Sequence, residues 1–310
     1  MKALLRFFTY SLLLVSAYNS HAQNRITDTT ATCIAFWENK ETHVYHITHI
    51  KEKSESGKTK TKAEASYEAH IKIIDSTADG FTVEWVYKNF TAPGQPENVL
   101  SSLNTLMEGL KVLYKTDDVG SFSELLNWQE IRDFSIGNYE LAMKNKNQDK
   151  EFVAALNQVK AIFQSKENIE NLLIKEVRLF HSPYGMEYST KGMVTETKLP
   201  NALGGDPFPA TITFKAEEIN KDNDHCKVIM NQEIDKRKAG PIIAAMLKKL
   251  SPSPIRDEET MRKQIKDMEI SDLNEFTYAI SGGWLKKIRF KRVSSLGNLK
   301  QTETYQFIKK

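Results

Sequence analysis

Apolar and polar residues alternate along many segments of this chain, the period-two pattern of half-buried β-strands. The alternation is clearest in residues 67–73, 81–87 and 208–219. The same pattern predicts further strands at 42–51, 186–199, 226–235, 268–280, 284–293 and 299–308. Strands with one apolar and one polar face are typical of an antiparallel sheet that lies on a core with one face and meets water with the other.

Between these strands, apolar residues recur at helical spacing. The spacing predicts helices at 97–110, over most of 127–180, at 238–250 and at 257–267. Asn127, with Glu130 three residues later, is typical of a helix start with a capping box. We therefore expect an α+β fold, a curved antiparallel β-sheet that is half-barrel-like, with helices packed on the concave side. No linker demands a division, so we expect residues 41–310 to form a single domain.

The beginning of the chain has the composition of a targeting segment. Lys2 and Arg6 precede a mostly apolar run of 12 residues, Phe7–Tyr18. Small residues follow, which predicts a signal peptide over 1–22 that is cleaved between Ala22 and Gln23. The run is shorter than the roughly 20 apolar residues of a membrane-spanning helix. We expect no transmembrane anchor after cleavage, and an exported protein that is periplasmic or extracellular.

Composition excludes several special classes of protein. The chain has 310 residues with 43 Lys and Arg, 40 Asp and Glu, and a net charge of +3. Without residues 1–22, which carry two basic and no acidic residues, 288 residues remain with a net charge of +1. This average composition excludes a collagen-like or disulfide-dense chain, and the balanced charge argues against nucleic acid as a partner. Residues 23–40 are polar and rich in Thr, and we expect a loosely held lead-in there.

Two cysteines, Cys33 and Cys226, are present in the whole chain. In an oxidising compartment the two can form one disulfide. The alternative is a pair of buried free thiols. Cys226 begins an alternating segment and is expected to face the core, which argues against a catalytic cysteine.

No local motif indicates catalysis or cofactor binding. The nucleophile elbow, the P-loop, the dinucleotide-binding glycine pattern and the zinc-protease helix are all absent from the sequence. His43, His46 and His49 would share one face of a helix, but their neighbours favour a strand, which separates His43 from His49 by roughly 20 Å. We therefore assign no catalytic residue, no metal site and no cofactor.

The one asymmetry of charge lies in residues 281–310, which hold eight basic residues and a single acid, Glu303. Lys287, Arg289 and Lys291 fall on one face of an expected strand. One interpretation is a patch for anionic envelope groups or lipid headgroups. The other, which we favour, is a solvated outer face whose lysines protect an edge strand from pairing.

Three features of the chain carry a resemblance. They are the sequence Ala22-Gln23, the hairpin Tyr114–Phe122 that runs into Asn127-Trp128, and the segment Gly283–Ile288. With these the chain resembles uncharacterised exported proteins of Gram-negative bacteria. Its layout also looks like the half-barrel of periplasmic lipoprotein carriers, in which a curved sheet with helices inside holds acyl chains. The resemblance implies a ligand on the concave face.

The leading hypothesis is an exported non-enzymatic protein that binds a lipid, another apolar small molecule or an envelope component in its concave sheet. It predicts a cavity lined by aromatic side chains such as Trp85, Phe214 and Phe276. One alternative is an interaction module of the cell envelope or surface with a filled core. Another is a hydrolase whose site is assembled from distant segments.

Overall fold

The computed structural model describes residues 26–94, 107–143, 163–172, 174–199, 206–250, 259 and 268–310. Several expectations lie outside these residues: the signal peptide over 1–22 with its cleavage between Ala22 and Gln23, most of the helix expected at 97–110, and nearly all of the helix expected at 257–267.

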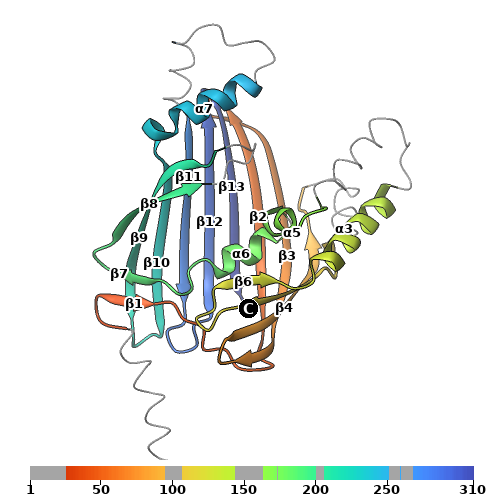
Figure 1. The fold of residues 1–310 in the computed structure, drawn as a ribbon, viewed down its shortest axis with the longest axis vertical. Coiled ribbons are helices and arrows are strands. Elements are labelled where there is room, and N and C mark those ends of the chain that lie inside the picture. The colour runs from red at the N-terminus through yellow and green to blue at the C-terminus, as the bar shows by residue number, and fades with distance from the viewer. Residues whose placement is uncertain are drawn as a thin grey trace, which may run out of the picture.

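One large antiparallel sheet organises the molecule (Figure 1). Its first group of strands is β2 (Thr42–Glu55), β3 (Lys58–Thr77), β4 (Gly80–Thr91), β5 (Lys111–Thr116) and β6 (Phe122–Leu125). Its second group is β8 (Met193–Leu199), β9 (Phe208–Asn220), β10 (His225–Ile234), β11 (Glu269–Tyr278), β12 (Leu285–Leu296) and β13 (Leu299–Lys309). Each group is a meander, and the two join where β2 pairs with β13, which gives the order β6-β5-β4-β3-β2-β13-β12-β11-β10-β9-β8.

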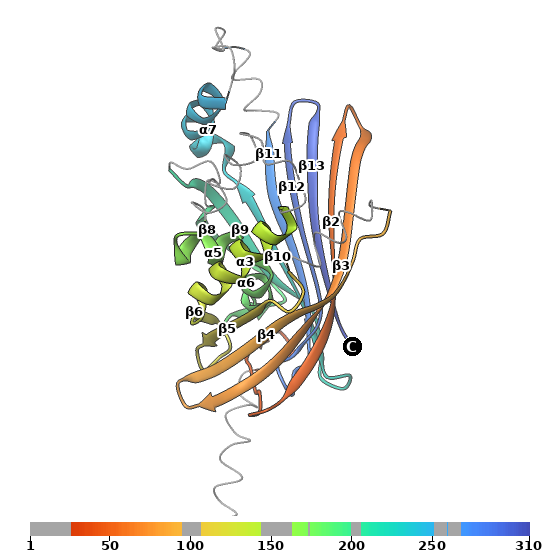
Figure 2. The same cartoon turned by 90° about the vertical axis from the view of Figure 1, so that its right-hand side faces the viewer.

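Helices lie on one side of this sheet, the concave side (Figure 2). The connection from β6 to β8 contains α3 (Trp128–Met143), α5 (Lys166–Leu172) and α6 (Lys175–His181). A fourth helix, α7 (Lys236–Leu250), follows β10, and a small separate sheet pairs β1 (Thr30–Thr32) with β7 (Glu187–Ser189). The expected α+β, half-barrel-like fold is confirmed.

The start of α3 falls where the sequence places it, but its cap differs. The Asn127 Oδ1 accepts a hydrogen bond from the Leu113 N–H at 2.8 Å, and its Nδ2 donates to the Lys111 carbonyl at 3.0 Å. Nδ2 also lies 3.3 Å from the Glu130 carboxylate. The Asn127 side chain therefore binds β5 instead of capping its own helix, and so fixes the helix start against the sheet.

The charged stretch 53–62 is the tip of a long hairpin. Both β2 and β3 continue into it, and Ser56 and Gly57 form the turn. Thr59 and Thr61 are β-branched, and β-branched side chains favour extended backbone. Cross-strand contacts such as the 3.3 Å ion pair between Lys60 and Glu55 support the extension.

The expectation of a loosely held lead-in is wrong for residues 31–37. Ala31, Cys33, Ala35 and Trp37 are all buried. Trp37 stacks on Trp284 with ring centroids 4.7 Å apart. The four buried residues alternate with other positions at period two, so a strand-like face was present in the sequence among the threonines.

Both cysteines are buried free thiols in the structure, the second of the two alternatives. Burial raises the pKa of Cys33 and of Cys226, which keeps both thiols protonated and unreactive. The disulfide between Cys33 and Cys226 is therefore not formed here, and its formation in an oxidising compartment stays a prediction.

Gly283 allows the lead-in to approach the sheet. Its φ is +70°, and a Cβ at this position would overlap the carbonyl oxygen of Ile34. Gly57 has a similar φ of +78° but has open space around its Cα. The two glycines thus share the same backbone requirement and differ in packing.

We predict that Gly283→Ala lowers the free energy of unfolding by several kcal/mol, whereas Gly57→Ala costs about 1 kcal/mol, the backbone strain alone. Chemical denaturation of both variants measures the difference. Equal losses in the two variants would show that the lead-in does not depend on this close approach.

His181 is a core residue whose partners could not be seen in the sequence. Its Nδ1–H donates to the Gly120 carbonyl at 2.7 Å, so its Nε2 accepts the Tyr114 hydroxyl at 2.8 Å. Burial lowers the pKa of His181 to about 4 from 6.5, against the weaker opposing effects of Gly120 and the Asp117 charge. The imidazole is therefore neutral inside the protein.

Acidification should destabilise the fold through His181. The unfolded chain binds this proton near pH 6.5 and the folded chain only near pH 4, so stability falls as pH decreases through that window, by about 3 kcal/mol at most. His181→Asn should remove this slope from pH-dependent denaturation curves. His70→Asn, a change on a partly exposed histidine, should leave it. Persistence of the slope in His181→Asn would assign it to another group.

Candidate functional site

The concave face is built from transverse rows, because neighbouring antiparallel strands place residues directly opposite one another. One row beneath α6 is apolar and closely packed. Its members, from β11 to β3, are Phe276, Ile288, Phe307, Ile47 and Tyr67. All five are buried, so this part of the concave face is a filled core.

The aromatic residues expected to line a cavity belong to this filled core. Trp85 is fully buried, and its ring meets the edge of Phe180 from α6 at 5.6 Å. Phe276 and Phe214 are also buried in the same cluster. These three residues therefore lie in packed core instead of lining an open cavity, with Phe180 of α6 against Trp85 and Tyr188 of β7 against Phe214.

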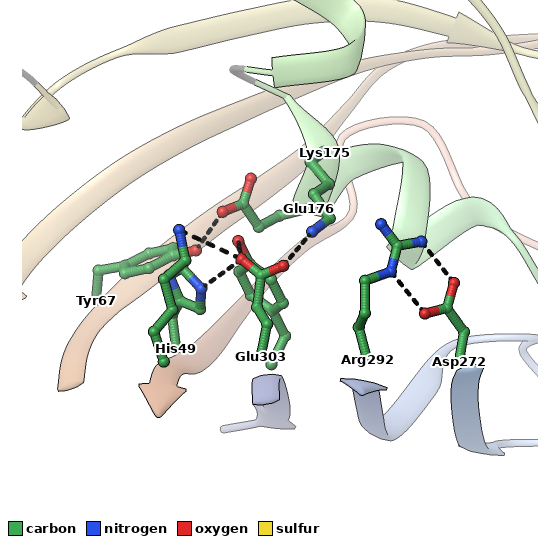
Figure 3. A network of polar contacts seen from close by, with 9 residues as sticks. His49, Tyr67, Lys175, Glu176, Asp272, Arg292 and Glu303 are labelled. Atoms are coloured by element: carbon green, nitrogen blue, oxygen red, sulfur yellow. Dashed lines mark hydrogen bonds and ion pairs between the residues drawn. The ribbon is translucent and has the colours of Figure 1, made fainter. Parts of the chain in front are cut away.

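Two rows above the apolar row, charges of alternating sign cross the same strands. Asp272 lies opposite Arg292, Arg292 opposite Glu303, and Glu303 opposite Lys51. We call these four residues the charged belt, and Figure 3 labels Asp272, Arg292 and Glu303 of it. It marks the boundary at which the apolar core ends.

Glu303 is the centre of the charged belt. Its carboxylate accepts hydrogen bonds from His49 Nε2 at 3.0 Å and from Lys175 Nζ of α6 at 2.8 Å, and Lys51 Nζ lies 3.5 Å away. Burial by itself would raise the pKa of Glu303, but these hydrogen bonds and positive charges lower it well below the ordinary value. Glu303 is therefore ionised at any physiological pH.

The first turn of α6 is fixed to the sheet by this network. The Lys175 ammonium lies over the rings of Phe290 and Tyr305, 5.3 and 5.2 Å from their centroids. The next residue, Glu176, accepts a hydrogen bond from the Tyr67 hydroxyl at 3.0 Å. Burial raises the pKa of Glu176, in opposition to the hydrogen bonds and positive charges around it.

The other end of the belt is a two-pronged ion pair. Arg292 donates from Nε and Nη2 to the two oxygens of Asp272, at 2.7 and 2.6 Å. The Asp272 side chain is 5% exposed. Bidentate pairing satisfies both oxygens of this buried carboxylate, which would otherwise be costly to bury.

An open groove of about 330 Å³ lies directly above the charged belt. The next row forms its floor, in which Ile270 faces Ser294, Ser294 faces Gln301, and Gln301 faces Lys53. The full lining consists of Lys53, Ser54, Met268, Glu269, Ile270, Ser294, Ser295, Leu299, Lys300 and Gln301.

Apolar side chains border the groove on the side of β11. Met268 and Ile270 belong to a second hydrophobic cluster, which includes Ala239 and Ile243 of α7. Leu299, at the start of β13, is 55% exposed although it is large and apolar. The groove is therefore continuous with an apolar surface beneath α7 and carries an uncovered apolar side chain at its edge.

The histidines that the structure describes do not assemble into one site. Each of four lies within hydrogen-bond distance of a different carboxylate, in the pairs His43–Glu41, His49–Glu303, His70–Glu68 and His225–Glu218. Among the described residues, no three metal-ligating side chains lie close enough together to hold a metal ion. Of the histidine segment 43–49, only His49 contributes to the belt.

The basic stretch near the end of the sequence divides between the two faces of β12. Lys287, Arg289 and Lys291 share the outer face, as expected, and Arg289 pairs with Glu275 at 2.8 Å. The favoured idea that they protect an edge strand is wrong, because β12 lies between β11 and β13. Arg292 points the other way, into the charged belt.

The sequence did not reveal that Lys175, Glu176, Asp272 and Arg292 belong to this polar network. Their partners come from strands and a helix that are far apart in the chain. One signal was available: Glu303 is the single acid within a basic stretch. An isolated acid of this kind on an alternating strand indicates a carboxylate with several cations near it.

No protein-family model matches the chain, and no curated protein matches it. The chain is similar to a solved structure titled "Lipid-protein interactions in lipovitellin", with a TM-score of 0.43 and 10% sequence identity over 88% of this chain. It spans 25% of the length of that chain. A likeness at this TM-score says nothing of the ligand or function of the present protein.

Within the described ranges, no helix combines the length and the apolar character that crossing a membrane requires.

We predict that Glu303→Gln lowers the free energy of unfolding by about 2–4 kcal/mol, because Lys175 and His49 lose the anion that compensates their burial. Glu84→Gln, which removes the partner of the exposed Lys111, should cost less than about 1 kcal/mol. Denaturation at neutral pH measures both. If Glu303→Gln lowers the free energy of unfolding no more than Glu84→Gln does, the belt does not stabilise the fold.

Proposed function

We propose that the protein is an exported, non-enzymatic binding protein that holds an apolar ligand in the groove above the charged belt. The observation that carries the proposal is the groove itself. Its volume of about 330 Å³ falls at the lower end of the range typical of small-molecule sites. The sequence predicted a ligand in the aromatic interior. The site proposed here lies in the upper part of the same concave face instead.

Apolar contact is available along the groove. Met268, Ile270 and Leu299 offer hydrocarbon surface, and the cluster beneath α7 extends it. An exposed leucine beside a groove loses contact with water when a hydrocarbon covers it, and each buried methylene contributes roughly 0.8 kcal/mol. The groove can therefore gain affinity from a flexible apolar chain.

The charged belt is the boundary of the groove on the side of the apolar core. Its side chains are held by hydrogen bonds and ion pairs to one another and to Lys175. An apolar ligand that entered this row would have to break buried ion pairs, each of which is costly to break. Ligand is thereby confined to the open groove, and α6 and the core beneath it stay undisturbed.

Export is part of the proposal and rests on the sequence. Residues 1–22 have the order of charged, apolar and small residues of a cleaved signal peptide. The proposed protein therefore acts in the periplasm or outside the cell, as do the lipoprotein carriers that its layout resembles.

Titration with the neutral apolar fluorophore N-phenyl-1-naphthylamine tests the site. We expect saturable enhancement of its fluorescence that Ser294→Tyr reduces at least fivefold in affinity, because the ring fills the floor of the groove. Thr302→Tyr adds the same ring to the outer face of the adjacent strand β13 and should bind like the parent protein.

Circular dichroism should show both variants folded. Absence of saturable binding in the parent protein, or equal binding by Ser294→Tyr and the parent, would overturn the proposal.

A further inference from the structure

We infer that the ligand is a single-chain anionic amphiphile, a long-chain carboxylate whose acid group pairs with Lys53. This inference rests on the proposed function and deepens it by naming the class of ligand. It is drawn from the arrangement of polar and charged groups along the groove floor, which differs at its two ends.

The floor changes from apolar to cationic in one direction. Ile270 begins the row on β11, the hydroxyl of Ser294 and the amide of Gln301 follow on β12 and β13, and Lys53 ends it on β2. Three strand spacings separate Ile270 from Lys53, roughly 14 Å at the Cα atoms. A ligand that satisfies both ends must be long and carry its charge at one end only.

Lys53 is the lysine of the groove floor, and it has no ion pair with a residue that the structure describes. Lys51, two residues earlier on β2, lies 3.5 Å from Glu303, and Lys175 donates to the same carboxylate at 2.8 Å. Lys53 forms no ion pair with any residue that the structure describes, and its side chain is exposed at the groove. Its ammonium is therefore free to bind an anion from solution.

The surroundings of Lys53 favour negative charge. Directly below it, the belt and Lys175 together place three cations against two carboxylates. Gln301, directly opposite Lys53, carries an amide that can donate a hydrogen bond to a carboxylate oxygen.

The one acid of the lining, Glu269, lies at the far end of the groove. It accepts a hydrogen bond from Ser271, which shares its face of β11, the outer face. A carboxylate headgroup at Lys53 therefore meets no fixed anion of the groove floor.

Lys287 provides a matched control. It lies on the outer face of β12, opposite Thr277 and Ile308, and does not line the groove. It is exposed, as Lys53 is. Lys287→Gln therefore makes the same change in net charge without touching the inner face.

The experiment measures displacement of N-phenyl-1-naphthylamine by three ligands of equal chain length below their micelle concentrations: palmitate, hexadecanol and hexadecyltrimethylammonium. For the parent protein we expect palmitate to bind about three- to tenfold more tightly than hexadecanol, and hexadecyltrimethylammonium to bind most weakly. Sodium acetate at millimolar concentration should displace nothing, because it lacks the apolar chain.

Lys53→Gln should reduce the affinity for palmitate to that for hexadecanol and leave hexadecanol unchanged. Lys287→Gln should keep the preference of the parent protein. The preference should also decrease as salt is raised, since an exposed ion pair is screened.

Equal affinity of the parent protein for palmitate and hexadecanol would overturn the inference and leave the proposed groove intact. Loss of the preference in both lysine variants would also overturn it, because the effect would then come from net charge. Failure of the fluorophore and of all three long-chain ligands to bind would overturn the proposed function itself.

Discussion

The pairing of β2 with β13 is the interaction on which the rest of the structure depends. It joins two meanders that are each continuous in sequence into one sheet. Every transverse row of the concave face crosses this seam: Ile47 meets Phe307 in the core, Lys51 meets Glu303 in the belt, and Lys53 meets Gln301 in the groove. Core, belt and groove thus all depend on the register of this one strand pair. A change of register by one residue would turn the side chains of one strand to the opposite face in all three rows.

The position of the polar rows decides where the molecule is solid and where it is open. Below the belt, α6 brings apolar side chains such as Phe180 against Tyr45 and fills the curved face. At the belt, the same helix begins with Lys175, whose charge is compensated by Glu303. A buried carboxylate is tolerated only with several donors, and here His49, Lys175 and Lys51 supply them. The concave face therefore changes from filled core to open groove over three rows.

Local patterns were sufficient to predict most strands, the start of α3 and the side on which the helices lie, because alternation and helical spacing are properties of short segments. They also placed Trp85 and Phe276 on the inner face. That face is covered by α6, which lies about 90 residues after Trp85 in the chain. No local pattern predicts a contact between segments so far apart. The partners of Glu303 were hidden for the same reason, since Lys51 is brought to it by a pairing across about 250 residues.

The seam between β2 and β13 also sets the order in which the chain can fold. The first meander can form early, but β2 keeps an open edge until β13 has been synthesised. Pairing across such a separation is slow, because the entropy of closing a long loop must be overcome first. Under the proposed export, this delay keeps the nascent chain in a form that can be threaded through a translocation channel.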